Sequence, residues 1–289
     1  MAAGPTHPRT GHPHITGGGG RSEPLQQAAF ALNAKQPEEA QRISEEILKR
    51  DPRNAGALHI LGFALLMRGR AQDAVAPLEA AARGRHDPEI ETRLALALSQ
   101  IGRRDDALSR LKRAAKRRPP YSPAFHGLGT LLFAMERCDE AIEVLRGGVK
   151  VAPMMPELST LLGSVYLKQR NFGEAKAAFG QALAISPNSP DALSGMGMAH
   201  YASGESGAAA DFFRRCLRSR PDDDTVWLQL GHCLLQLGER DAGDECFRAA
   251  ARGDPKRYGR ALASLAASGR GRAWLKPTAA ARFMRGAKT

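Results

Sequence analysis

Residues 156–187 read PELSTLLGSVYLKQRNFGEAKAAFGQALAISP, and the spacing within them decides the fold. Gly163 is followed twelve residues later by Ala175, and Ala175 is followed twelve residues later by Pro187. The middle position of this trio recurs at intervals of 33 or 34 residues, at Ala40, Ala74, Ala107, Ala141, Ala175, Ala209 and Gly243. A period of this length predicts a stack of helical hairpins.

Each predicted hairpin carries its own packing pattern. The small residue that opens the trio lets two helices cross closely, as we expect for Gly129 and Ala141. A larger apolar residue stands four positions after the middle one, at Leu78, Leu111, Leu145, Phe179, Phe213 and Phe247, with Ser44 as the exception. Another core position follows three residues later, and spacings of three and four share one helical face. Proline then ends the second helix, because it lacks an N–H and clashes with the preceding turn.

This pattern resembles the tetratricopeptide repeat family. The resemblance covers residues 21–257, in seven units that begin near residues 21, 55, 88, 122, 156, 190 and 224. It implies an all-α fold, a right-handed superhelical solenoid of antiparallel helix hairpins. The first unit fits least well, with Pro24, Gln27 and Ala28 where large apolar residues are common. Terminal repeats are expected to deviate, since one side faces water.

Charge and composition separate the ends of the chain from its middle. The 289 residues include 42 basic and 30 acidic ones, and nine of the basic residues stand in residues 256–289 without any acid. Residues 22–255 are therefore nearly neutral. We expect residues 1–20, which are rich in glycine and proline, to be a disordered tail. No apolar run is long enough to predict a transmembrane segment.

The C-terminal end, residues 258–289, is predicted to hold a capping helix at 258–268 and then a basic tail. The residues of this tail singled out for binding are Arg270, Arg272, Trp274, Lys276, Arg282, Phe283 and Arg285. One interpretation is contact with an anionic partner, which would be an acidic protein, a membrane surface or nucleic acid. The other interpretation is a solvated cap whose aromatic residues fold back on the last repeat.

The resemblance also implies a peptide-binding groove, lined by the first helix of each hairpin. Carried onto this chain, its positions are His59, Phe63, Arg93, Leu96, His126, Thr130, Phe133, Thr160, Ser164, Ser194, Met198, Gln229 and His232. Family members that grip a C-terminal carboxylate carry Lys, Asn and Arg at such positions, and no run of units here supplies that set. We therefore expect an extended or helical peptide that buries apolar side chains against Phe63, Leu96, Phe133 and Met198.

Enzymatic function is not expected. No nucleophile, base and orienting group fall at a productive spacing, and neither a phosphate-binding loop nor a metal-ligand spacing is present. The sequence thus predicts no catalytic residue, metal site, cofactor or small-molecule substrate. Cys216 takes a core position usually held by alanine, which suits a reduced thiol and a cytoplasmic location.

Two hypotheses on function follow. The first is a non-catalytic scaffold or adaptor that binds a peptide segment of a protein partner in the concave groove. The alternative is an adaptor that its basic C-terminal tail localises to an anionic surface.

Overall fold

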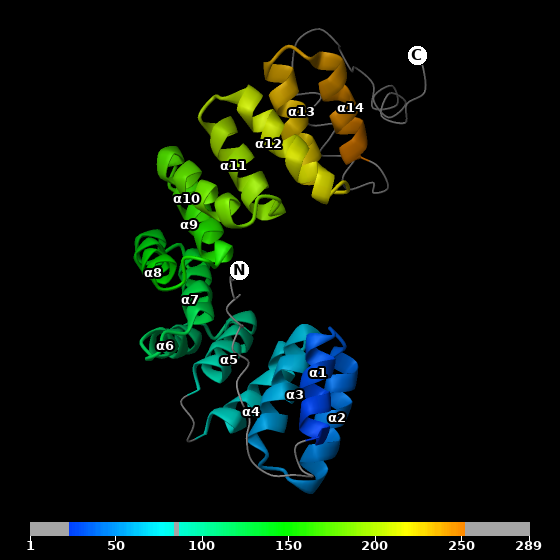
Figure 1. Ribbon diagram of the computed structural model, residues 1–289, viewed down its shortest axis with the longest axis vertical. Helices are drawn as coiled ribbons and strands as arrows, with labels where there is room; N and C mark the ends of the chain where they lie inside the picture. The colour runs from blue at the N-terminus through cyan, green and yellow to red at the C-terminus, as the bar shows by residue number, and fades with distance from the viewer. Residues whose placement is uncertain (1–22, 84–86, 252–289) are drawn as a thin grey trace, which may run out of the picture. The chain divides into compact units, whose positions relative to one another are not determined.

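The computed structural model describes residues 23–83 and 87–251, which form fourteen α-helices and no strand. They fall into two compact units, one within residues 1–103 and the other within residues 104–289. The first unit contains α1–α5 and the second contains α6–α14, as Figure 1 labels them. The predicted N-terminal tail, capping helix and basic tail lie outside the described residues.

The helices alternate along the chain as first and second members of hairpins. The first helices are α1 (Glu23–Asn33), α3 (Ala55–Met67), α5 (Pro88–Gln100), α7 (Ser122–Ala134), α9 (Pro156–Lys168), α11 (Pro190–Ala202) and α13 (Asp224–Gln236). The second helices are α2 (Pro37–Arg50), α4 (Ala71–Ala82), α6 (Arg104–Ala115), α8 (Cys138–Val151), α10 (Phe172–Ile185), α12 (Ser206–Ser219) and α14 (Arg240–Ala250). Within each unit, consecutive helices pack on one another. The predicted class, an all-α solenoid of helix hairpins, is confirmed.

Large side chains fill the space that the glycines leave between paired helices. A Cβ atom on Gly163 would lie 2.8 Å from Cδ1 of Phe179, and one on Gly129 would lie 2.5 Å from Cδ2 of Leu145. The same contact joins Gly62 to Leu78, Gly197 to Phe213 and Gly231 to Phe247. Each glycine thus contacts the large apolar residue sixteen positions later. That side chain fits between the two helices only because the first helix carries no side chain at the glycine.

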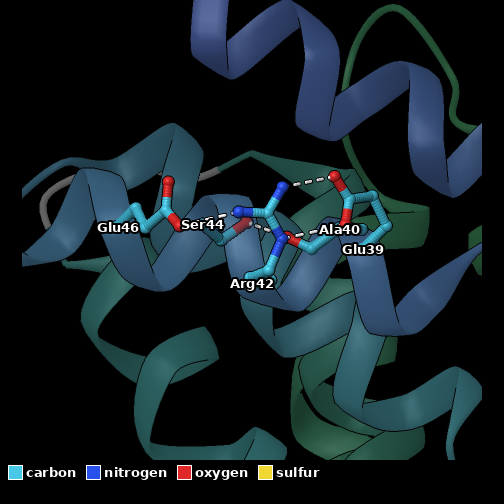
Figure 2. A network of polar contacts seen from close by, with 5 residues as sticks. All are labelled: Glu39, Ala40, Arg42, Ser44 and Glu46. Carbon is cyan, nitrogen blue, oxygen red and sulfur yellow. Dashed lines mark hydrogen bonds and ion pairs between the residues drawn. The ribbon is translucent and has the colours of Figure 1, made fainter.

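In the first hairpin a smaller residue stands at the position of the large apolar side chain. Ser44 takes the position of the large apolar residue and is fully buried. Its hydroxyl donates a hydrogen bond of 2.7 Å to the carbonyl oxygen of Ala40, one turn earlier on α2 (Figure 2). The polar group is therefore satisfied within its own helix, which removes the cost of burying it.

The turn inside each hairpin has one conformation. The residue at the fifteenth position of each hairpin repeat has a positive φ, between 56° and 85°. These residues are Lys35, Gly69, Gly102, Glu136, Arg170, Gly204 and Gly238. This left-handed residue ends the first helix, and the next N–H bonds back to a helix carbonyl, as Arg70 does to Leu65 at 2.9 Å. Glycine adopts this conformation without strain. At Lys35, Glu136 and Arg170 the side chain makes the same conformation less favourable.

Candidate functional site: the faces of the first helices

First helices of successive hairpins lie side by side. In the second unit α7 contacts α9, α9 contacts α11, and α11 contacts α13, while in the first unit α3 contacts both α1 and α5. The second helices make their main contacts with first helices rather than with one another. The side on which helices approach each other more closely is the inner side of a curved stack, so the first helices line the inner side of each unit.

All the groove positions expected from the sequence fall on first helices. The first unit holds His59 and Phe63 on α3, with Arg93 and Leu96 on α5. The second unit holds His126, Thr130 and Phe133 on α7, Thr160 and Ser164 on α9, Ser194 and Met198 on α11, and Gln229 and His232 on α13. Most of these side chains are half-buried, whereas Thr130 is exposed and Leu96 is 48% exposed. Their role in binding stays a prediction.

In the first unit the positively charged groove residue, Arg93, already contacts two neighbouring side chains. The guanidinium carbon of Arg93 lies 3.5 Å from the centroid of the Phe63 ring, close enough for a cation–π contact. Arg93 also donates a hydrogen bond of 2.5 Å from Nη2 to Oε1 of Glu89, one turn earlier on α5. The positive charge is therefore held over an aromatic face, and Phe63 presents less free apolar surface than the sequence suggested.

His59 lies close to this pair in an apolar setting. Burial lowers the pKa of His59 to about 4, helped by the positive charge of Arg93 and opposed by Asp87. Its Nε2 atom is buried and has no hydrogen-bond partner in the part of the chain that the structure describes. The imidazole is therefore neutral at pH 7, which leaves the groove face of α3 uncharged at this position.

In the second unit three of the polar groove residues bond to their own helices. The hydroxyl of Thr130 donates to the carbonyl oxygen of His126 at 2.9 Å, and that of Thr160 donates to Pro156 at the same distance. Ser164 donates to Thr160 at 3.0 Å. These hydroxyls are uncharged and already donate a hydrogen bond, so they need no donor or acceptor from a bound partner. They are therefore compatible with a surface that binds apolar side chains.

The apolar groove residues of the second unit differ in their surroundings. Nζ of Lys168 lies 5.6 Å from the centroid of the Phe133 ring and forms an ion pair of 2.8 Å with Glu136. Met198 packs on the core cluster formed by helices α11 to α14. Burial lowers the pKa values of His126 and His232. The repeat pattern gave no indication of Lys168, because the position of Lys168 beside Phe133 depends on how one repeat packs on the next.

Among residues 23–83 and 87–251 no cluster of three or more His, Cys, Asp or Glu side chains could hold a metal ion. No helix within these ranges is long and apolar enough to cross a membrane. All four cysteines are free thiols, and Cys216, Cys233 and Cys246 are buried.

A stack of helix hairpins with its small-to-large packing pairs defines the class of helical repeat proteins. Models of the tetratricopeptide repeat match residues 25–88, 92–149, 126–171 and 160–224, and a second model of this repeat matches residues 201–267. The chain therefore belongs to the tetratricopeptide repeat family, as predicted from its sequence. No curated protein matches its sequence significantly.

Solved structures of other repeat proteins share the fold. A tetratricopeptide repeat protein from Parabacteroides merdae has a TM-score of 0.63 and 15% identity, over 87% of this chain and 99% of its own. A chain of the APC/C hetero-tetramer Cut9–Hcn1 has a TM-score of 0.68 and 16% identity, over 83% of this chain and 48% of its own. A chain of the human IFIT1 dimer with PPP-AAAA has a TM-score of 0.66 and 17% identity, over 86% of this chain and 63% of its own. Such low identities show the fold alone.

Proposed function

We propose that this protein is a non-catalytic interaction scaffold that binds an apolar segment of a protein partner along its first helices. The observation that carries the proposal is the weakly charged face of α7, α9, α11 and α13. On that face the hydroxyls of Thr130, Thr160 and Ser164 bond to their own helices, and the apolar residues expected to contact a partner are Phe133 and Met198. The four free thiols favour a reducing compartment, and we propose the cytoplasm.

A helical or extended peptide fits such a face for a physical reason. Burial of its apolar side chains is favourable by about 25 cal/mol for each Å² removed from water. Backbone groups of a partner that lie across the first helices meet few competing charges. Because specificity then comes from the spacing of apolar side chains, a partner is recognised by pattern rather than by charge.

A charge placed on the face tests this proposal. The substitutions Phe133→Asp and Met198→Asp introduce a carboxylate where an apolar side chain is expected to be buried, and each should weaken partner capture by about tenfold or more. Capture is measured by affinity purification from native lysate, followed by binding of the purified partner. Met154→Asp is the matched control, since Met154 is 75% exposed and lies in the turn between α8 and α9.

Circular dichroism establishes that each variant keeps its helical content. Unchanged partner affinity in folded Phe133→Asp and Met198→Asp variants would contradict binding on this face. Equal loss in the Met154→Asp control would also contradict it, because the loss would then not depend on the first helices.

A further inference from the structure

The first hairpin exposes an aromatic side chain at a position that is buried in every later hairpin. Phe30 on α1 is 72% exposed. Its counterparts at the same repeat position are Ala64, Ala97, Leu131, Val165, Ala199 and Cys233, and none is more than 4% exposed. Ala64, for example, belongs to one core cluster with Ala31 and Ile43 of the preceding hairpin. Each later hairpin is thus covered at this face by its predecessor, whereas no helix of residues 23–83 and 87–251 precedes α1 to cover the face of α1 and α2.

A hollow accompanies Phe30 on this face. Its volume is about 490 Å³, and it is lined by Glu23, Gln26, Gln27, Phe30, Ala31, Gln36, Glu39 and Ile43. Apolar surface from both helices is therefore bordered by two carboxylates and three side-chain amides, and none of the described residues in the lining is basic. Arg42 pairs with Glu39 at 2.6 Å and with Glu46 at 2.8 Å, and all three residues lie on α2 (Figure 2). Such a surface suits an apolar group that is flanked by donors and positive charge.

The other end of the same sequence has the complementary chemistry. Residues 256–289 contain nine basic residues and no acidic one, together with Trp274, Leu275, Phe283 and Met284. We propose that the C-terminal segment of a second copy of this chain binds the face of α1 and α2, with an aromatic side chain against Phe30 and basic side chains near Glu23 and Glu39. The chain then associates head to tail.

A second copy is favoured over the same copy by the order of the elements along the chain. Each repeat of a solenoid contacts its neighbours in sequence, and the twelve helices α3 to α14 separate the face of α1 and α2 from the C-terminal segment of the same copy. Contact between unlike surfaces on two copies is heterologous, and it leaves one free face at each end of the assembly. This proposal is independent of the peptide-binding face proposed above.

Sedimentation velocity of the full chain over a range of concentrations tests the proposal. We expect reversible self-association that Phe30→Glu weakens by about tenfold or more, because a charge replaces the apolar anchor. Glu23→Lys should weaken it as well, by repelling the basic segment. Both residues lie on the surface of α1, so the variants are expected to fold, which circular dichroism verifies. The matched control Met154→Glu should leave the association unchanged.

Tryptophan emission identifies the segment that binds. The chain has two tryptophans, so the Trp227→Phe variant leaves Trp274 as the only one. Its emission should shift to shorter wavelength as concentration rises, and Phe30→Glu should remove that shift. A monomer at every concentration, or association insensitive to Phe30→Glu, would overturn the proposal. So would a Trp274 emission that is independent of concentration, or one that shifts only when phosphatidylserine vesicles or a polynucleotide are added.

Discussion

At the scale of single residues, the contact between a glycine and a large side chain sixteen positions later determines how closely two helices pair. Phe179 makes this contact twice, because its ring lies between two glycines. Cβ atoms built on Gly163 and Gly195 would approach its ring to 2.8 and 2.4 Å. An added methyl group at either position must push the ring or the helix away.

Gly163→Ala is therefore expected to destabilise the second unit by roughly 1–3 kcal/mol in urea unfolding. Gly180→Ala is the control, since its Cβ would meet only Met196 at 3.8 Å and alanine favours a helix. Phe179→Leu should partly rescue Gly163→Ala, because the third repeat already combines Ala95 with Leu111 at these positions. Equal stability of Gly163→Ala and Gly180→Ala would mean that the pair does not set the helix distance.

The buried imidazole of His59 leads to a prediction on pH. Its pKa is about 4 in the folded chain and near 6.5 when unfolded, so the unfolded state alone takes up a proton between these values. The free energy of unfolding should therefore fall as the pH drops from about 6.5 to 4, by up to roughly 3 kcal/mol. His59→Gln should lose this component, as measured by urea unfolding across the range. The same pH dependence in both proteins would contradict a buried neutral His59.

At the scale of the helix hairpin, the turn depends on one left-handed residue. Gly204 has a φ of 81°, and a Cβ atom there would meet nothing within 4 Å. Gly207, three residues later inside α12, also has open space around it but no positive φ. The two glycines therefore separate backbone strain from side-chain crowding.

Gly204→Ala should lower the free energy of unfolding by about 1 kcal/mol or more, because alanine resists the left-handed conformation. Gly207→Ala should raise it slightly, because alanine favours a helix. Thermal and urea unfolding of the two variants provide the comparison. A loss of the same size in both would show that the positive φ is not the cause.

Much of the hairpin could be predicted from the sequence, because its period and its small-to-large pairs repeat in nearly every unit. The left-handed turn position could not, since three of its seven residues are Lys35, Glu136 and Arg170, which give no glycine signal. The cation–π contact between Arg93 and Phe63 could not be predicted from the sequence either, because it depends on the packing of α5 beside α3. Repeated patterns reveal what all the units share, whereas contacts between particular units need coordinates.

At the scale of the whole molecule, the repeats form two compact units, and the division falls between α5 and α6. The 33- or 34-residue period itself continues across residue 103 and does not mark this division. Each unit carries its own row of first helices. In the first unit Arg93 lies 3.5 Å from the centroid of the Phe63 ring, whereas in the second unit Lys168 lies farther from the Phe133 ring, at 5.6 Å, and Met198 is half-buried. The second unit is therefore expected to provide most of the affinity for a partner.

Selection from a peptide display library against the purified full chain tests the central claim most directly. The selected peptides are then measured against Phe133→Asp, Met198→Asp and the control Met154→Asp by calorimetry. We predict peptides with regularly spaced apolar side chains, whose affinity falls by about tenfold or more in the first two variants and stays the same in the control. Peptides that bind all three variants as tightly as the unaltered chain would contradict binding along the first helices.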